Sequence, residues 1–103
     1  MKQPTIGTQL IADERQKQID KYGFTAQHHV KNAEFYSEDQ LVYAANAIAQ
    51  RVDVEKYPET PKNWDEKWFR SLCDRHREER LVIAGALLAA EIDRIKEIEK
   101  SWI

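Results

Sequence analysis

The clearest hydrophobic pattern in the chain is a long helical repeat near its C-terminal end, from about Asp74 to Lys100. Apolar side chains recur there every seven residues, at Leu81, Leu88, Ile95 and Trp102, a spacing that places them along one face of a helix. The middle of the segment, VIAGALLAA, is apolar on nearly all sides, which is typical of a buried helix. A small monomer has few helices with which to enclose it, so the pattern predicts homo-oligomerisation through this helix.

A second helical pattern covers the N-terminal part of the chain, over about Gly7–Lys21. Either Thr5 or Thr8 can cap its start, and Gly23 is placed to end it in a left-handed conformation. The following stretch, Phe24–Tyr36, is polar, aromatic and aperiodic, which predicts a loop.

A third helical pattern follows this stretch. Ser37 and Gln40 have the spacing of a capping box, which predicts a helix start at Ser37. The apolar positions of this helix form one stripe, made of Leu41, Ala44, Ala45, Ile48 and Val52. Over residues 53–69 the pattern breaks, and Pro58 and Pro61 exclude a continuous helix. A short helical turn is predicted from Asn63.

Composition supports an all-α fold. The chain has 103 residues, 42% of them hydrophobic, and only three Gly and three Pro, so turn residues are scarce and long helices are favoured. We expect one domain over residues 1–103. Its three main helices form a small bundle, with a linker containing Trp and Pro before the long C-terminal helix.

Charge and cysteine content narrow the context. The net charge is −2 with acids and bases interleaved, so a nucleic-acid partner is not expected. The single Cys73 excludes an intrachain disulfide and fits a reducing compartment. The N-terminus lacks the apolar stretch of a signal peptide, and Leu81–Ala90 is about half the ~20 residues of a membrane span. We therefore expect a cytoplasmic protein with no membrane partner.

Glu91 is the most unusual candidate for chemistry, because it falls on an apolar stripe of the C-terminal helix. One interpretation is a metal ligand or a substrate-facing acid. With Glu14 and Gln18, it would supply oxygen ligands between helices, for which Mg²⁺ is the suggested cofactor. The other interpretation, which we favour, is an ion pair with an arginine such as Arg15 or Arg80.

Three further groups have two interpretations each. His28 and His29 could bind phosphate or act as a base, or be a solvated loop pair. The arginines before the long helix could bind an anion or form a salt-bridged turn; they are Arg75, Arg77 and Arg80. Trp64 and Trp68 could stack on a base or, as we favour, fill the core.

Three segments in order carry a resemblance to known proteins: ERQKQIDKYGFTAQHH (14–29), SEDQLVYAANAIA (37–49) and REERLVIAGALLAAEIDRI (77–95). Together with the Trp-rich linker they resemble a group of small, mostly uncharacterised bacteriophage and prophage proteins, which implies a bacterial host cell. The chain is more weakly similar to the all-α MazG-like NTP pyrophosphohydrolases. That similarity implies a nucleotide ligand and Mg²⁺-dependent hydrolysis.

Two hypotheses about function result, and whether any reaction occurs is left open. The first is a phage-type helical protein that binds a nucleotide or similar phosphorylated ligand. If it is an enzyme, the expected reaction is Mg²⁺-dependent, MazG-like hydrolysis of that ligand. Its ligand-binding residues would be Glu14, Gln18, His28, Arg80 and Glu91, with Glu14 and Glu91 as metal ligands. The second is a non-catalytic accessory protein or inhibitor that contacts a host factor. A polar pocket favours the first hypothesis, and an exposed apolar patch favours the second.

Overall fold

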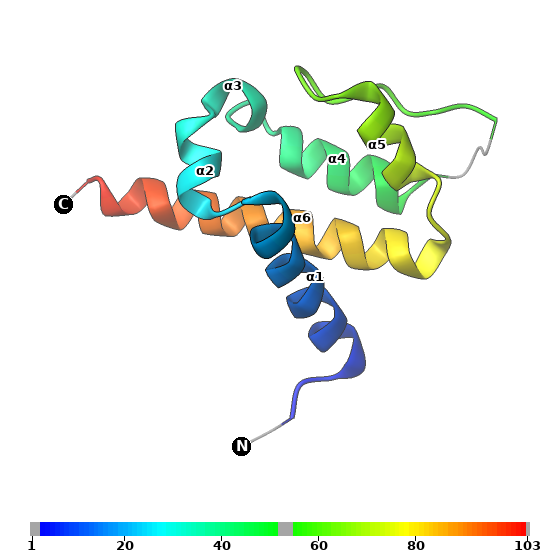
Figure 1. Cartoon of the computed structure of the whole chain (residues 1–103), viewed down its shortest axis with the longest axis horizontal. Helices are drawn as coiled ribbons and strands as arrows, with labels where there is room; N and C mark the ends of the chain where they lie inside the picture. Colours follow the sequence, from blue (N-terminus) through cyan, green and yellow to red (C-terminus); the bar gives the residue numbers. More distant parts are fainter. Residues whose placement is uncertain (1–2, 52–54, 103) are drawn as a thin grey trace.

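The computed structural model describes residues 3–51 and 55–102, and throughout these residues the regular structure is helical (Figure 1). The all-α prediction is therefore confirmed. The helices are α1 (Ile6–Tyr22), α2 (Ala26–Lys31), α3 (Ala33–Tyr36), α4 (Gln40–Ala49), α5 (Glu66–Cys73) and α6 (Arg77–Lys100). None of these helices has an apolar stretch long enough to cross a membrane.

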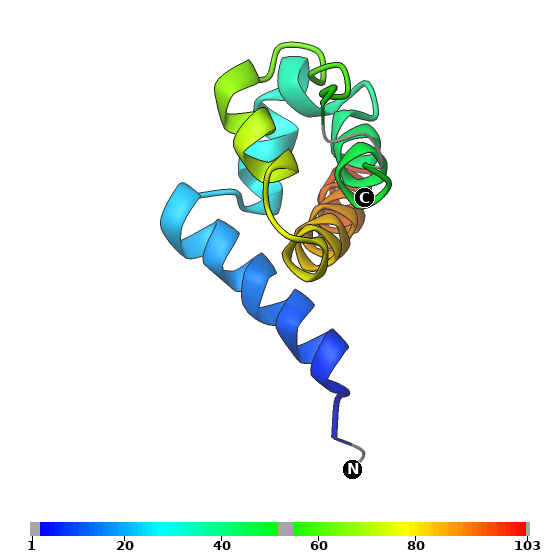
Figure 2. The same ribbon diagram turned by 90° about the vertical axis from the view of Figure 1, so that its right-hand side faces the viewer.

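The long C-terminal helix α6 is the centre of the fold, since α1, α2, α4 and α5 all pack against it. Helix α4 lies alongside α6, and α1 crosses α6 at a steep angle (Figure 1). Figure 2 shows α1 running away from the other helices towards the N-terminus, so that its first turns project from the body. Side chains of α1, α5 and α6 line a cavity between these three helices.

Local capping explains where α1 and α5 begin and end. The Thr5 hydroxyl accepts a hydrogen bond from the Thr8 N–H at 3.2 Å, and Gly23 ends α1 with φ +70°. The sequence predicted the end at Gly23 and offered Thr5 as one of two alternative caps. Asp65 caps α5 by accepting a hydrogen bond from the Trp68 N–H at 2.7 Å. The helix then continues to Cys73, so it is longer than the short helical turn that the sequence predicts.

The predicted loop at residues 24–36 is wrong, because this stretch forms α2 and α3. The Thr25 hydroxyl caps α2 by accepting from the His28 N–H at 3.1 Å. Both helices are too short to show a hydrophobic period of their own, with six and four residues. Their stability therefore depends on packing, which the local pattern does not reveal.

The predicted helix starts also need correction. Ser37 ends α3 instead of beginning α4, and the residue before α4 is Asp39, with φ 61°. Gln40 still reaches back, because its side-chain oxygen accepts from the Glu38 N–H at 2.7 Å. Helix α6 begins at Arg77, because Asp74 is the C-terminal cap of α5. The expected stripe position Val52 lies outside the described residues.

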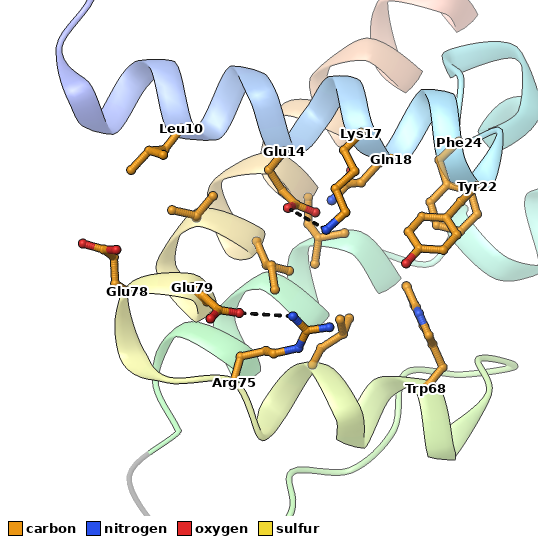
Figure 3. A pocket seen from close by; sticks show the side chains of 14 residues that line it. Leu10, Glu14, Lys17, Gln18, Tyr22, Phe24, Trp68, Arg75, Glu78 and Glu79 are labelled. Carbon is orange, nitrogen blue, oxygen red and sulfur yellow. Dashed lines mark hydrogen bonds and ion pairs between the residues drawn. The ribbon is translucent and has the colours of Figure 1, made fainter.

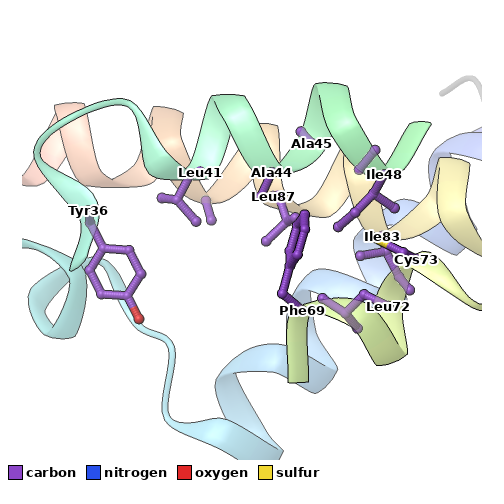
Figure 4. Packing of buried hydrophobic residues seen from close by; sticks show 12 residues of the cluster. Tyr36, Leu41, Ala44, Ala45, Ile48, Phe69, Leu72, Cys73, Ile83 and Leu87 are labelled. Carbon is purple, nitrogen blue, oxygen red and sulfur yellow. The ribbon is translucent and has the colours of Figure 1, made fainter. Parts of the chain in front are cut away.

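The hydrophobic core lies between α4, α5 and α6 (Figure 4). Phe69 of α5 is fully buried between the other two helices. Small alanine side chains of both α4 and α6 lie in this core, which allows the two helices to pack closely. The residues that these three helices contribute to the core cluster are Leu41, Ala44, Ala45, Ile48, Phe69, Leu72, Cys73, Ile83, Ala84, Leu87 and Ala90.

Helix α1 crosses α6 at Gly85, where a side chain would have no room. A Cβ at Gly85 would lie 2.6 Å from Ile11 Cδ1 and 2.9 Å from Ile11 Cγ1. We expect Gly85→Ala to destabilise the protein by a net amount of about 1 kcal/mol, because overpacking (~1–3 kcal/mol) outweighs the gain in helix propensity (~1 kcal/mol). Urea unfolding measures the effect.

The matched control for this prediction is Gly7→Ala, since a Cβ there meets nothing within 4 Å. We expect Gly7→Ala to be neutral or stabilising. Combining Gly85→Ala with Ile11→Ala should remove the overpacking. If Gly85→Ala were as stable as Gly7→Ala, the close crossing of α1 over α6 would be refuted.

Candidate functional site

A cleft lies between α1 and α5, above α6 (Figure 3). Its outer compartment has a volume of about 190 Å³. In Figure 3, side chains from α1 and from α5 point towards one another across it, with Tyr22 opposite Trp68 at one end. Polar and charged side chains line it: Glu14, Lys17, Gln18, Arg75, Glu78 and Glu79.

A second compartment of about 150 Å³ adjoins this one, and it is called the inner compartment because the buried residues His29 and Tyr36 line it. The two compartments share four lining residues, Gln18, Phe24, Trp68 and Leu87. The inner compartment is mostly aromatic, and its remaining lining residues are His29, Phe35, Tyr36, Leu41, Asn63, Trp64 and Asp65. A concave apolar site with few polar groups is the usual form of a small-molecule site.

The chain turn after α1 brings Phe24 into this cleft. Gly23, in the left-handed conformation, donates its N–H to Gln18 O and Ile19 O, and the chain then turns into α2. Arg15, which is buried, donates to Phe24 O at 2.8 Å and pairs with Asp93 of α6 at 2.9 Å. Arg15 therefore fixes the end of α1, and with it Gln18 and Phe24, against α6.

Aromatic side chains form the walls of the inner compartment. The rings of Trp64 and Trp68 have centroids 5.7 Å apart, and Phe24 meets Trp68 edge-on at 6.1 Å. His29 lies against the Tyr36 ring with centroids 4.2 Å apart. Trp64 is held in place because its indole N–H donates to Phe35 O at 2.7 Å. The walls are therefore rigid flat surfaces on which a planar ligand can pack.

Two buried polar side chains at the inner compartment have unsatisfied atoms. Gln18 is 5% exposed and His29 is 1% exposed. Gln18 Oε1 and both ring nitrogens of His29 are buried without a hydrogen-bond partner among the described residues. Each such atom costs about 1–3 kcal/mol of stability. Native proteins leave few such groups, so three of them at one cavity mark a place where a ligand or an ordered water would supply the missing bonds.

Burial keeps the His29 imidazole neutral. Desolvation lowers its pKa from 6.5 to about 4, and the nearby charge of Arg15 adds to the effect. A neutral imidazole has one N–H donor and one acceptor nitrogen. With the Gln18 carbonyl, the inner compartment therefore offers a ligand two acceptors and one donor at ordinary pH.

The outer compartment carries charges of both signs. Lys17 and Arg75 supply two cations, and each already has a carboxylate neighbour, Glu14 at 3.8 Å from Lys17 and Glu79 at 3.1 Å from Arg75. Glu78 adds a third carboxylate. In the part of the chain that the structure describes, no group of three or more His, Cys, Asp or Glu side chains is arranged to hold a metal ion.

Of the five residues proposed from the sequence to bind a ligand, Glu14 and Gln18 line this cleft, and Arg75 of the arginine cluster lines it as well. The third proposed oxygen ligand, Glu91, is not among the cleft-lining residues and forms a two-bond ion pair with Arg94, at 2.6 and 3.0 Å. The ion-pair interpretation of Glu91 thus has the right chemistry, but the partner is one turn away on α6 and is neither Arg15 nor Arg80.

Arg80 and His28 also lie away from the cleft lining. Arg80 donates to the carbonyls of Ile48, at 2.9 Å, and Arg51, at 3.4 Å, and so caps the C-terminal end of α4. His28 stacks on Phe24, with centroids 5.7 Å apart, and its ring contacts Asn32. Its neighbour His29 is buried at the cavity, so the interpretation of the two histidines as a solvated loop pair is wrong for His29.

The sequence pattern did not single out the aromatic cavity. His29, Tyr36 and Phe24 fall in the stretch that was predicted to be a loop. The dense aromatic content of residues 22–36 and of the Trp-rich linker was the available signal. Trp64 and Trp68, expected in the core, pack against it and also line the cavity.

The comparisons with family models, with curated proteins and with solved structures gave no match to this chain.

Proposed function

We propose that this protein binds a nucleotide or a similar phosphorylated ligand in the cleft, with the base in the inner compartment. The supporting observation is the set of unsatisfied polar atoms, on Gln18 and His29, at a cavity with aromatic walls. Aromatic walls favour a flat ring, and the polar atoms favour a ring with hydrogen-bonding edges. Purine and pyrimidine bases have both properties.

The size of the inner compartment agrees with one ring of a base. Its volume is about 150 Å³, and a protein cavity of roughly that volume holds a benzene molecule. An amino group or ring N–H of the base would donate to Gln18 Oε1. The two nitrogens of neutral His29 would pair with one acceptor and one donor of the base.

The ligand would extend past Gln18 and Trp68 into the outer compartment. Its phosphate would meet Lys17 and Arg75 there, both of which can bind anions. Because the lining carboxylates outnumber these cations, we expect a nucleotide to bind more tightly with Mg²⁺ than without it. The proposal covers binding; MazG-like hydrolysis stays a prediction from the resemblance.

A ligand panel tests this proposal. We expect one base class, as nucleoside or nucleotide, to raise the melting temperature, and isothermal titration to give a 1:1 complex with each chain. Gln18→Met and His29→Leu should each weaken binding about tenfold or more, because a buried ligand atom then loses its partner. The same variants should stabilise the free protein by about 1 kcal/mol, since an unsatisfied group is removed.

The matched control is Gln16→Met, an exposed glutamine on the same helix that bonds Asp20. It should leave binding unchanged. If no base, nucleoside or nucleotide shifted the melting temperature with or without Mg²⁺, the proposal would fail.

A second proposal rests on a different feature, the outer face of α6. Leu81, Leu88 and Ile95 are each about two-fifths exposed, and Ile92 is 59% exposed. Three of these side chains, Leu81, Leu88 and Ile95, belong to the seven-residue repeat of the long helix through which the sequence predicts homo-oligomerisation. We propose self-association through this face; a host protein, as expected of a phage-type accessory protein or inhibitor, is the alternative partner. Sedimentation of the isolated protein separates the two, since self-association needs no other component.

A further inference from the structure

The uncovered face of α6 has the spacing of a coiled-coil seam. Leu81, Leu88, Ile92 and Ile95, here called the α6 seam, are exposed to 41%, 41%, 59% and 42%. With Gly85 and Glu99 they fill positions separated alternately by four and three residues, which is the a/d pattern of paired helices. Helix α1 crosses α6 at the edge of this face, where Ile11 lies against Gly85, and the four seam side chains stay exposed within the described chain.

From this seam we infer that two copies of the chain pair through α6 in antiparallel orientation, with Leu88 at the two-fold axis. The inference rests on the proposed self-association and adds its geometry. An isologous pair needs a self-complementary surface. Leu81 and Ile95 lie seven residues before and after Leu88, so an antiparallel pair places Leu81 of each copy against Ile95 of the other.

Charge complementarity selects this orientation over the parallel one. Arg77 and Glu99 lie eleven residues before and after Leu88, about three helical turns, and therefore close to the same face. In the antiparallel pair Arg77 of one copy meets Glu99 of the other, at both ends of the interface. In a parallel pair Arg77 would meet Arg77 and Glu99 would meet Glu99, which is repulsive.

The proposal also explains why this face is apolar. The 24-residue helix α6 is about 36 Å long, and the two exposed leucines and two exposed isoleucines occupy the middle of that length. A second copy would bury them all, with the charged pairs at the rim where they stay hydrated. An apolar centre with a polar rim is the usual anatomy of a stable interface.

Sedimentation measures association, and Leu88→Lys tests the centre of the seam. We expect wild type to form dimers at micromolar concentration. Leu88→Lys should raise the dimer dissociation constant by about a hundredfold or more, because two lysines would meet at the axis. The matched control is Ile6→Lys, which changes an 82% exposed isoleucine on α1 and should leave association unchanged. A monomeric wild type would overturn self-association, and equal effects of the two variants would overturn the seam.

Cysteine cross-linking tests the orientation separately. Leu88→Cys should form an intermolecular disulfide under mild oxidation, whereas Leu81→Cys and Ile95→Cys should each fail alone. In an antiparallel pair the two copies of residue 81 would be about 21 Å apart, far beyond disulfide reach. Mixing the Leu81→Cys chain with the Ile95→Cys chain should restore the cross-link.

Wild-type protein controls for the native Cys73, which is buried. Cross-linking of Leu81→Cys on its own, with no product from the mixture, would overturn the antiparallel orientation while leaving self-association intact. Failure of the ligand panel would affect neither result, because the seam and the cleft are different surfaces of α6.

Discussion

Replacing Arg94 by methionine is expected to lower the free energy of unfolding by about 3 kcal/mol, the range found when one member of a buried ion pair is removed. Glu91 is 8% exposed and accepts two hydrogen bonds from Arg94, at 2.6 and 3.0 Å. This pairing raises the pKa of Arg94. Without the guanidinium, the Glu91 carboxylate would be buried without its cation, and urea unfolding at pH 7 would report the loss.

The double variant Glu91→Met with Arg94→Met separates the buried charge from the loss of packing. It should be more stable than Arg94→Met alone, because no unpaired charge remains. The matched control is Lys96→Met, which breaks the exposed pair with Glu99 at the same spacing on the same helix. That change should cost less than about 1 kcal/mol. An Arg94→Met protein as stable as the control would show that Glu91 is hydrated.

Acid is expected to destabilise the protein through His29, by about 3 kcal/mol in total. The folded-state pKa of His29 is about 4, below its ordinary 6.5, and one pKa unit corresponds to about 1.4 kcal/mol. Between these pH values the unfolded chain binds a proton at His29 that the folded chain does not. The contribution of His29 to the free energy of unfolding is therefore fully present above about pH 6.5, and it is lost as the pH falls towards 4.

The groups around His29 support this direction. Burial is the largest cause of its low pKa, the charges of Arg15, His28 and Arg94 lower it further, and Asp93 alone raises it. The measurement is the difference in unfolding free energy between wild type and His29→Leu from pH 7 to pH 4. Over this pH range wild type should lose about 3 kcal/mol of unfolding free energy relative to His29→Leu. Carboxylates titrate in both proteins, so their effects cancel in the difference. Parallel pH curves for wild type and His29→Leu would contradict the prediction.

Much of the fold follows from local sequence patterns. The stripe of Leu41, Ala44, Ala45 and Ile48 predicts the buried face of α4, and all four residues are buried. Thr5 and Gly23 mark the ends of α1 because capping depends on neighbouring residues only. The predicted helix starts at Ser37 and Asp74 were wrong because neighbouring residues alone do not show whether a cap residue begins one helix or ends another. In the structure these two residues end the short helices α3 and α5.

The candidate site could be predicted only in part. Gln18 and Glu14 were found because they share a helical face that points inward. His29 was missed because a six-residue helix has no readable period, and its burial depends on Phe24, Tyr36 and α6 meeting around it. The metal site at Glu14 and Glu91 was inferred from two carboxylates on inward stripes. Which neighbour each carboxylate meets, Lys17 for Glu14 and Arg94 for Glu91, depends on side-chain positions in three dimensions.

The long C-terminal helix shows both what the sequence determines and what it leaves to the tertiary structure. Its sequence alone determined that it is a helix and that its middle is apolar all round, because periodicity and hydrophobicity are properties of the chain. The tertiary structure decided how these faces are divided. Ile83, Ala84, Leu87 and Ala90 pack in the core, while the heptad residues Leu81, Leu88 and Ile95 stay exposed on another face. The physical reason is that the neighbouring helices cover only some faces of α6. Where each neighbour crosses α6, as α1 does at Gly85, is fixed by packing between residues far apart in the sequence.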